Sequence, residues 1–427
     1  MDTKKTRIST LQPPAGFKDI LPDISNIWQF TEQVCREIFD NSGYKEIRTP
    51  ILEKTQLFER SIGNETDIVQ KEMYTFTDRS GDTLTMRPEG TAPAVRAYIE
   101  HSLGLTEQIF KIYYIGQMFR HERPQKGRLR QFHQIGAEIF NVKEPAAEVE
   151  LLIILNGIFD KLNVKNKRVQ LNSVGCPDCR PEYLNKLRIF LESSHAKLCN
   201  NCQRRMNTNP LRVLDCKEEE CIPIIKTAPV IMDYLCSLCS EHFKKLQALL
   251  KETGIAFEIN TKLVRGLDYY TRSAFEIISE TGGSQNAIAA GGRYDNLVES
   301  MGGEPTPAAG FAIGVERLID IADIKNKFLN PLLFVLSLGA AASAAGLKIA
   351  SNLRERGIYV EFGYNERSLK SQLRRANKLG ARFVLIIGEN EMKSGAVTLK
   401  NMEAGTQESI SLKDINHLAE LVISSKK

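Results

Sequence analysis

The sequence predicts an α+β protein that carries a separate α/β unit at its C-terminal end. Two β-rich blocks predict a sheet, one over 110–140 and one beginning at 257, and a cysteine-rich segment lies between them. The two blocks therefore indicate one sheet that is divided by an insertion. After Pro331, strand-like runs alternate with helical runs, which is typical of an α/β unit with a mostly parallel sheet.

The composition is that of a globular protein with room for more than one core. The chain has 427 residues, of which 42% are hydrophobic, and a net charge of +5. Its beginning has no apolar run of the signal-peptide type, and no apolar run reaches the length of about 18 residues that a membrane helix needs. We therefore expect a cytoplasmic protein without membrane contact, and the small net charge permits an RNA partner without requiring one.

The first elements follow from apolar periodicity and from turn residues. A helix is expected over 27–41, and Gly43 follows it as a stop signal. The next run is strand-like and is broken at Pro50. Further along, a short strand changes into a helix, with Pro88 and Gly90 at the junction.

A cationic segment, FRHERPQKGRLRQFHQIGAE, lies at 119–138 inside the first β-rich block. Pro124 and Gly127 mark a turn, so the pattern predicts two strands joined by a charged loop. The cations of the segment are Arg120, His121, Arg123, Lys126, Arg128 and Arg130. Such a mixture of cations and aromatic residues suits a polyphosphate nucleotide, although a solvated surface loop can have the same composition.

Eight of the nine cysteines fall in the segment between the two β-rich blocks. They form the short pairs Cys176 with Cys179, Cys199 with Cys202, Cys216 with Cys221, and Cys236 with Cys239. Three of these pairs have the two-residue gap of zinc-ribbon ligands, which lets one turn aim two thiolates at a tetrahedral ion. We expect one or two zinc sites; buried or incidental thiols are the alternative, and disulfides are weaker in a reducing compartment. His195 and His242 lie in the same region, but each is better explained as an ordinary surface or helix residue.

The remaining elements follow the same signals. Helical patterns cover 146–162 before the cysteines and 241–254 after them. The block that begins at 257 combines strand runs and glycine turns with a final helix. In the C-terminal unit, helices are expected over 341–355 and 369–379, each between strand-like runs.

Five segments together resemble the motifs of histidyl-tRNA synthetases, a family of class II aminoacyl-tRNA synthetases. YKEIRTPILE is similar to motif 1, with its proline at Pro50, the cationic segment is similar to motif 2, and GFAIGVERL is similar to motif 3. LVRGLDYYTRSAFE and AAGGRYDNL resemble the two signatures that separate the histidine enzyme from its class II relatives. The resemblance covers nearly the whole chain, and five motifs in register are far more specific than one.

The resemblance implies a domain plan and a reaction. It implies an antiparallel catalytic domain over 1–170 and 255–327, an insertion domain over 171–254, and an anticodon-binding domain over 331–427. It also implies a homodimer with motif 1 at its interface. The implied reaction uses ATP, with Mg²⁺, to convert L-histidine into histidyl-adenylate and pyrophosphate, and then transfers the histidyl group to tRNA(His) and releases AMP.

Both steps of this reaction develop negative charge, which suits guanidinium groups because they stay charged and bind phosphate oxygens with two donors. By resemblance, Arg120 would bind the α-phosphate and Arg128 the terminal phosphates. Arg317 would complete this clamp, and Phe132 would stack on the adenine. An isolated arginine is more often a solvated ion-pair partner, but three at motif-matching positions indicate an ATP site.

Arg265 matches the family's arginine near the reacting carboxylate and the α-phosphate. The carboxylate of histidine is already ionised at neutral pH, so the first step needs positioning and charge neutralisation more than a base. We therefore expect Arg265, together with Arg120, to be catalytic. An ion pair with the nearby Asp268 is the alternative for Arg265.

Selection of histidine needs polar groups that match a neutral imidazole, which has one donor and one acceptor nitrogen. Glu138 can accept a hydrogen bond and Tyr270 can donate or accept one, and the family pattern places both at the ring. The same pattern adds to the histidine site Glu89, Thr91 and Gln134 around the α-amino group, Arg265 at the carboxylate, and Tyr269. Tyr294 would help to close the pocket and Gly292 would permit a close backbone approach, with core packing as the alternative for the tyrosines.

The tRNA contacts are the least specific part of the prediction. By resemblance, Gln125 and Lys126 of the motif 2 loop would lie near the acceptor end. Cations over 204–212 and over 367–382 offer contacts to the RNA backbone, although each stretch can equally be a solvated helix face.

Two other kinds of protein also share parts of this pattern. A non-catalytic relative of the synthetases, such as the regulatory subunit of an ATP phosphoribosyltransferase, typically lacks the C-terminal domain and signature residues that this chain keeps. A zinc-dependent RNA-binding module accounts for the cysteines but leaves the nucleotide motifs unexplained.

Overall fold

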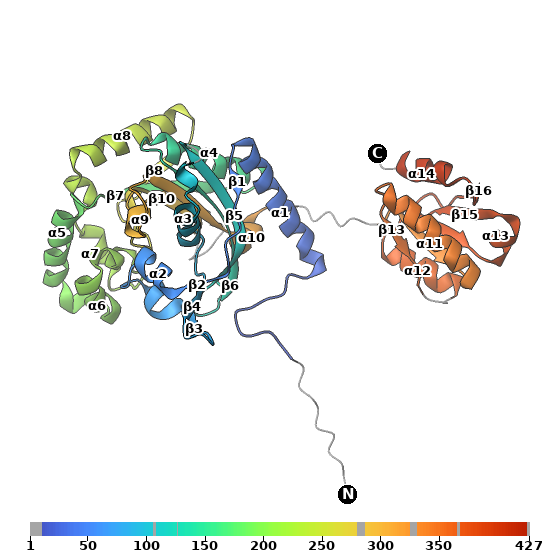
Figure 1. Cartoon of the computed structure of the whole chain (residues 1–427), viewed down its shortest axis with the longest axis horizontal. Helices are drawn as coiled ribbons and strands as arrows, with labels where there is room; N and C mark the ends of the chain where they lie inside the picture. The colour runs from blue at the N-terminus through green and yellow to red at the C-terminus, as the bar shows by residue number, and fades with distance from the viewer. Residues whose placement is uncertain are drawn as a thin grey trace, which may run out of the picture. The chain divides into compact units, whose positions relative to one another are not determined.

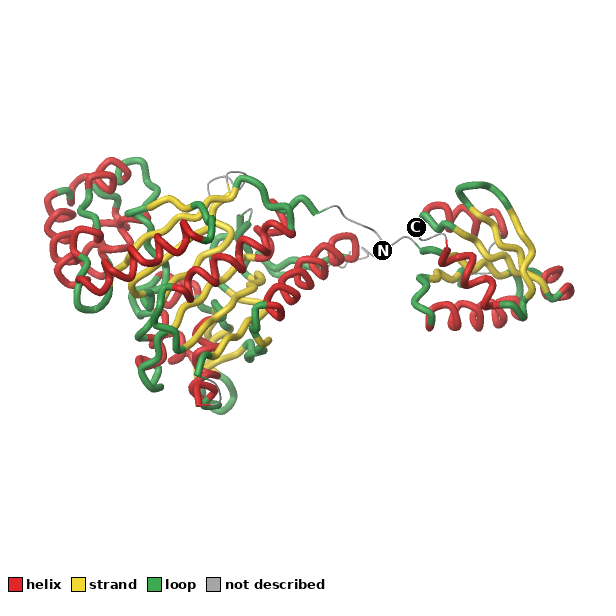
Figure 2. The backbone as a smooth tube through the Cα atoms, turned by 90° about the horizontal axis from the view of Figure 1, so that it is seen from above, coloured by secondary structure: helices red, strands yellow, loops and turns green. Residues whose placement is uncertain are grey.

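The computed structural model describes residues 11–105, 108–125, 127–279, 287–324, 331–364 and 368–424. The chain forms two compact units, Met1–Asn326 and Lys327–Lys427. In each unit, helices border a sheet (Figures 1 and 2). The boundary between the units agrees with the separate C-terminal unit that the sequence predicts after Pro331.

The first unit is built on an eight-stranded sheet. Its strands, in spatial order, are β1 (Lys45–Glu46), β5 (Phe110–Phe119), β6 (Gln131–Phe140), β11 (Ala308–Gly314), β10 (Ala287–Arg293), β9 (Thr271–Ser279), β7 (Lys167–Gly175) and β8 (Phe257–Ile259). The pairs from β5 to β7 are antiparallel, whereas β1 and β8 add parallel to the two edges. The predicted antiparallel sheet, divided by an insertion, is therefore confirmed.

A three-stranded sheet accompanies the large one, in the order β2 (Leu52–Lys54), β4 (Thr83–Met86) and β3 (Tyr74–Thr77). The strand-like run around Pro50 thus divides as its proline predicts, because β1 and β2 join different sheets. The longer helices that accompany these sheets are α1 (Pro22–Asn41), α2 (Thr55–Ile62), α3 (Thr91–Glu100), α4 (Ala146–Lys161), α8 (Ser237–Glu252) and α10 (Val315–Ile321), with the short α9 (Leu297–Ser300). Helix α1 begins earlier than the expected 27–41, because Pro22 occupies a first-turn position that suits proline.

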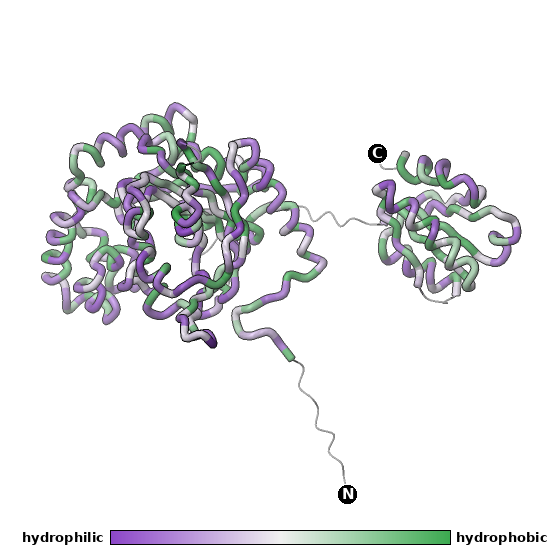
Figure 3. Tube along the Cα trace, viewed as in Figure 1, coloured by the Kyte–Doolittle hydropathy of each residue, from purple (hydrophilic) through white to green (hydrophobic). Residues whose placement is uncertain are grey.

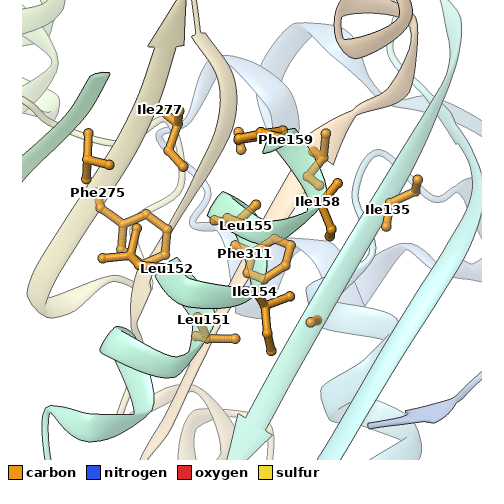
Figure 4. Close-up of a cluster of buried hydrophobic side chains, with 14 of the residues drawn as sticks. Ile135, Leu151, Leu152, Ile154, Leu155, Ile158, Phe159, Phe275, Ile277 and Phe311 are labelled. Carbon is orange, nitrogen blue, oxygen red and sulfur yellow. The ribbon is translucent and has the colours of Figure 1, made fainter. Parts of the chain in front are cut away.

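Helix α4 packs its apolar face on the sheet and forms the main core (Figure 4). Leu155 and Phe159 of α4 lie beside Phe275 of β9 and Phe311 of β11, and all of these side chains are buried. Each such side chain contributes roughly 1.5–3 kcal/mol by leaving water. The same core includes residues of α1 and α8, so segments on both sides of the cysteine-rich stretch share it.

The cysteine-rich segment folds into short helices with a hydrophobic cluster of their own. The helices are α5 (Arg180–Ser193), α6 (Asn200–Thr208) and α7 (Ile222–Thr227), with the 3₁₀ turns η3 (His195–Lys197), η4 (Pro210–Asp215) and η5 (Ile231–Tyr234). Their cluster extends from Tyr183 to Ile231 and is centred on residues such as Leu187 and Val213. This separate core is narrower than the expected insertion, because β7 extends the large sheet to Gly175 and α8 packs in the main core.

The second unit has a five-stranded sheet in the order β13 (Val360–Phe362), β12 (Leu333–Ser337), β14 (Phe383–Ile387), β15 (Ala396–Asn401) and β16 (Gln407–Ser411). Its helices are α11 (Ala340–Glu355), α12 (Leu369–Lys378), α13 (Glu389–Ser394) and α14 (Ile415–Ser424). The expectation of a mostly parallel sheet is wrong at one side, where β14, β15 and β16 pair antiparallel. A short loop with Gly405 at φ +72° joins β15 to β16, and strands joined in this way must run antiparallel.

Hydropathy changes within single helices of both units, as expected when one face of a helix is buried (Figure 3). Among the described helices, none is both long and apolar enough to cross a membrane alone. The segments Ile222–Tyr234 and Ser237–Glu252 meet that test only together, and they are bent by 103° at their break.

A buried ion network ties α4 to the strands. The carboxylate of Glu148 accepts hydrogen bonds from Arg293 Nη2 (2.5 Å), Arg293 Nε (3.0 Å) and Ser273 Oγ (2.7 Å), and its Oε1 lies 2.7 Å from His242 Nε2. Burial alone would raise the pKa of Glu148, but its hydrogen bonds with His242 and Arg293 outweigh burial and hold that pKa at about 2. His242 is therefore a core residue in this network.

We expect Glu148→Gln to lower the free energy of unfolding by about 3 kcal/mol at pH 7, because the fully buried Arg293 loses its buried counter-ion and keeps, among the described residues, only Asp295, at 3.1 Å. The pKa of Glu148 is lower in the folded protein than in the unfolded chain, where it is about 4.3, so its carboxylate stabilises the fold fully above that pH. This contribution is lost as the pH falls toward 2. The difference in the free energy of unfolding between the native protein and the variant should therefore become smaller in acid. Urea unfolding followed by fluorescence of Trp28, the single tryptophan, reports on this unit.

The matched control is Glu150→Gln in the same helix. Glu150 is 34% exposed and pairs with Lys111 at 2.7 Å, so its loss should cost below about 1 kcal/mol. Equal losses in the two variants would contradict the role given to the buried network.

Candidate active site

A cavity of about 220 Å³ opens over the large sheet in the first unit. Residues from the cationic segment, from the LVRGLDYY signature and from the start of α10 line it. The structure brings together in its wall every residue predicted for ATP and every residue predicted for histidine except Glu138: these are Glu89, Thr91, Arg120, Arg128, Phe132, Gln134, Arg265, Tyr269, Tyr270 and Arg317.

The antiparallel hairpin of β5 and β6 carries the cationic segment, as predicted. The ladder runs from Phe110 opposite Phe140 to Phe119 opposite Gln131, so the charged residues lie in the loop that joins the two strands. This loop ends in a tight turn, where the backbone of Gln125 exchanges hydrogen bonds with that of Arg128. The side chain of Gln125 is exposed and does not line the cavity, and Lys126 lies outside the described residues.

Backbone carbonyls hold two of the cavity's arginines. Arg120 Nε donates to the carbonyl of Pro88 (2.9 Å), and its guanidinium lies 5.4 Å from the ring centroid of Phe132. Arg317 donates from Nε to the carbonyl of Gly127 (3.0 Å) and from Nη1 to that of Ala287 (2.9 Å). Carbonyls fix the guanidinium groups without cancelling their charge, so positive potential remains available to an anion.

Burial and neighbouring charge act together on Arg317. Burial lowers the pKa of Arg317, and the guanidinium groups of Arg128 and Arg120 lower it further. The lowered pKa of Arg317 shows that three guanidinium groups lie close together in this part of the cavity.

Glu122, which the sequence analysis did not select, is the counter-ion within this cluster. Its carboxylate lies 3.0 Å from Arg128 Nη1 and 4.0 Å from Arg120 Nη1. The signal was present in the sequence, since Glu122 is the single acidic residue between Arg120 and Arg130.

Arg265 lines the same cavity and pairs with Glu276 of β9, with 2.6 Å between Nη1 and Oε1. Its Nε is buried and has no hydrogen-bond partner among the residues that the structure describes. The expected alternative, an ion pair with Asp268, is not formed within the described residues, because Asp268 bonds Asn209 instead. Arg265 thus keeps a donor for a bound group.

Two hydrogen-bond acceptors line the cavity wall, Glu89 just before α3 and Gln134 of β6. Glu89 accepts hydrogen bonds from the backbone N–H groups of Thr91 (2.8 Å) and Ala92 (2.7 Å), and burial raises the pKa of Glu89. Gln134 of β6 has a buried Oε1 that is not hydrogen-bonded within the described part of the chain. A cationic amino group would satisfy both side chains.

Glu138 is completely buried and is not one of the cavity-lining residues. It accepts hydrogen bonds from Thr91 Oγ1 (2.8 Å), from Tyr114 Oη (3.3 Å) and from Tyr294 Oη. Burial raises the pKa of Glu138 to about 8, although the hydrogen bonds from these hydroxyls oppose the shift. Gly310 stands opposite Glu138 in the ladder, where a Cβ would collide with the carboxylate.

The tyrosines form a wall around this carboxylate. The ring centroids of Tyr269 and Tyr270 are 4.7 Å apart, and those of Tyr269 and Tyr294 are 5.6 Å apart. Gly292 lies behind them, where a Cβ would collide with the carbonyl of Ser273. Tyr114 belongs to the same group but was missed, because its strand pattern looks like ordinary core.

The cysteines gather into two clusters in the insertion. The first cluster contains Cys176, Cys179, Cys236 and Cys239; the second contains Cys199, Cys202, Cys216 and Cys221. In each, the Sγ atoms lie within 4.8 Å of one another, and neighbouring sulfurs approach to 3.7–3.9 Å. Four sulfurs on a tetrahedral zinc at 2.3 Å would be roughly 3.8 Å apart, so the thiols have the spacing that such an ion requires.

Neither histidine of the region joins these clusters. His242 bonds Glu148, and His195 is exposed in η3. The pairing of the cysteines could not be deduced from sequence, because each cluster joins residues from distant turns.

Comparisons with known proteins match nearly the whole chain. A family model for histidyl-tRNA synthetase matches residues 16–179 and 226–318, and an anticodon-binding domain model matches 333–419. The histidine–tRNA ligases of Trichlorobacter lovleyi and Syntrophotalea carbinolica are 48% and 49% identical to this chain, covering 93% and 94% of it and 95% and 96% of their own lengths. The structure of apo histidyl-tRNA synthetase from S. aureus matches with a TM-score of 0.80 and 34% identity, covering 98% of this chain and 100% of that one. The chain therefore belongs to the histidyl-tRNA synthetase family, the class II aminoacyl-tRNA synthetases that use ATP to ligate histidine to its tRNA through histidyl-adenylate.

Proposed function

We propose that histidyl-adenylate forms in the cavity over the large sheet. The observation that carries this proposal is that one cavity is lined both by the arginine cluster and by the histidine signature with Arg265 and Tyr270. Arginines suit the phosphates of ATP, and the signature residues suit an amino acid, so the two substrates would meet within reacting distance. A non-catalytic regulatory relative would have no use for this combination.

The arginine cluster is the proposed ATP site. Arg120 would bind the α-phosphate, and Arg128 and Arg317 would bind the terminal phosphates. The adenine would stack on Phe132, which already lies against the guanidinium of Arg120. Mg²⁺ would accompany the phosphates, and the carboxylates of Glu122, Glu276 and Glu316 in the cavity wall are ligands of the type that this ion prefers.

Arg265 is the proposed catalytic residue at the reacting carboxylate. Its guanidinium would neutralise charge as the histidine carboxylate attacks the α-phosphorus, with Arg120 on the other side of that phosphate. The pair with Glu276 would hold Arg265 in place without occupying all of its donors.

The polar groups at α3 and β6 are the proposed selectors of histidine. Glu89, Thr91 and Gln134 would bind the α-amino group, and the unpartnered Oε1 of Gln134 supports this role. Glu138, Tyr269 and Tyr270 would bind the ring. A site whose buried polar groups need an imidazole to satisfy them penalises other side chains, because those groups then remain unpaired.

The second unit and the loop of motif 2 are the proposed RNA contacts. Gln125 and Lys126 would approach the acceptor end of tRNA(His), and 331–427 would bind the anticodon through cations of α12 such as Arg374, which is exposed. We also propose a homodimer, a cytoplasmic location, and the division into catalytic parts 1–170 and 255–327 with an insertion at 171–254.

The two cysteine clusters are the proposed structural zinc sites. Four thiolates in a closed tetrahedron are the ligand set of a structural rather than a catalytic zinc. The insertion's own hydrophobic cluster is small, and metal binding would supply the folding free energy that so small a core lacks.

We expect Arg265→Ala to lower histidine-dependent ATP–pyrophosphate exchange by at least about 10²-fold, because a donor to the transition state is lost. Thermal unfolding of the variant should be unchanged. Arg79→Ala, at an exposed arginine in the turn between β3 and β4, is the control and should keep normal exchange. Exchange close to normal in Arg265→Ala would refute the assignment.

We expect Glu138→Gln to raise the KM for histidine by about 10-fold or more at about pH 8.5, where the Glu138 carboxylate is ionised, while the KM for ATP changes little, since a neutral amide cannot replace a charged acceptor. Because the pKa of Glu138 is raised to about 8, its carboxylate fraction grows between pH 7 and 8.5. Histidine affinity of the native enzyme should therefore improve over this range, and that of the variant should not. If the histidine affinity of the two proteins changed with pH in the same way, Glu138 would not be the residue that binds the histidine ring.

We expect protein purified without chelators to contain about two equivalents of zinc by elemental analysis. Cys236→Ser and Cys216→Ser should each remove about one equivalent, because they belong to different clusters. Cys35→Ala, at a buried cysteine of α1, should leave the metal content unchanged. Less than one equivalent in the native protein would favour free thiols.

A further inference from the structure

We propose that Arg180 is a positioning residue that fixes Tyr270 of the histidine pocket to the first cysteine cluster. The inference rests on the roles proposed above for Tyr270 and for that cluster. It concerns a residue outside the cavity wall, since Arg180 does not line the active-site cavity.

Arg180 joins the cysteine turn to the pocket with both its backbone and its side chain. It follows Cys179 directly and begins α5, and its backbone N–H donates to the carbonyl of Cys176 (3.0 Å). Its Nη2 donates to the carbonyl of Tyr270 (2.6 Å), and its Nε donates to the carbonyl of Val174 (3.1 Å). A displacement of the cysteine turn would therefore be transmitted to Tyr270.

The sheet ladder alone does not define the backbone at this point. Strand β9 begins at Thr271, and its pairing with β7 is shifted between Ser173 and Gly175. Arg272 takes a φ of +56°, which is strained for a residue with a side chain, and Ser173 Oγ bonds its carbonyl at 2.6 Å. Tyr270 thus precedes an irregular stretch, where side chains must supply the anchors that a regular ladder would give.

An arginine suits this position for two reasons. Its planar fork has donors at fixed angles and can hold the carbonyls of Val174 in β7 and of Tyr270 before β9 at once, which the point charge of a lysine cannot do. A divalent ion with four thiolates carries a net charge of −2, and Arg180 places a cation beside it. The same residue therefore balances the charge of the cluster and fixes the pocket.

The segment that carries the second cluster also contacts the LVRGLDYY signature. Asn209, between Cys202 and Cys216, donates from Nδ2 to Asp268 Oδ1 at 2.9 Å. A second cavity, of about 250 Å³, lies behind the signature and is lined by Arg180, Asn209 and Asp268. The insertion thus holds both Asp268 and Tyr270, two residues apart.

The test is a comparison of Arg180→Met with Arg188→Met by ATP–pyrophosphate exchange. Arg188 lines the second cavity from the same helix but is exposed, so it is a matched control. We expect Arg180→Met to raise the KM for histidine by about 10-fold or more, because a shift of about 1 Å in a binding group can cost as much as 10²-fold. The KM for ATP should change less than about 2-fold, and Arg188→Met should leave both unchanged.

Two further measurements distinguish a positioning role of Arg180 from a general loss of structure. Arg180→Lys, which keeps the charge but loses the planar fork, should recover only part of the loss in histidine KM. Zinc content and thermal unfolding of the variants should stay at native values. A histidine KM that is unchanged, or that rises together with the KM for ATP, overturns the role of Arg180. Native protein without zinc overturns the link to a metal cluster, and elemental analysis detects that failure independently of the kinetics.

Discussion

The antiparallel ladder through β5, β6, β11, β10, β9 and β7 is the constraint on which the active site depends. It pairs Gln134 with Gly314 and Glu138 with Gly310, so strands from distant parts of the chain present one polar surface. A slip of one residue would turn every one of these side chains to the opposite face. The glycine opposite Glu138 shows how closely register and chemistry are linked, since only this residue leaves room for the carboxylate.

Charge in the cavity is arranged so that most of it stays available to substrate. The guanidinium groups of Arg120 and Arg317 bond to carbonyl oxygens, and Glu122 forms ion pairs with Arg128 and Arg120 of the motif 2 loop. Dipoles hold a cation in position at little cost to its field, whereas a full counter-ion would weaken it. Such an arrangement suits the phosphate binding proposed for this cavity.

Sequence patterns predicted the elements that depend on interactions between residues close together in the chain. Helix α11 and the hairpin of β5 and β6 follow from periodicity and turn residues, and the motif arginines converge as expected. The antiparallel edge of the second sheet was not predicted, because alternation of strands and helices gives no sign that the chain forms a hairpin after β14. Tyr114, Arg180 and the pairing of the cysteines depend on neighbours that the fold brings from far along the chain, so no local pattern could reveal them. The sequence marks Glu138 as an acid at the end of a cationic segment, but its burial behind three hydroxyls is a property of the packed sheet.

The order of the cysteines has a consequence for how the chain matures. The second cluster closes within 199–221, and this loop lies inside the one that the first cluster closes between Cys176 and Cys239. With metal bound as proposed, the inner loop would close during synthesis as soon as residue 221 has emerged, whereas the outer loop would wait for residue 239. Prior closure of the inner loop shortens the flexible chain that the outer one must span, which lowers its entropic cost. The insertion can thus be complete before β9, β10 and β11 leave the ribosome, and these strands would then add to a sheet whose neighbouring scaffold already exists.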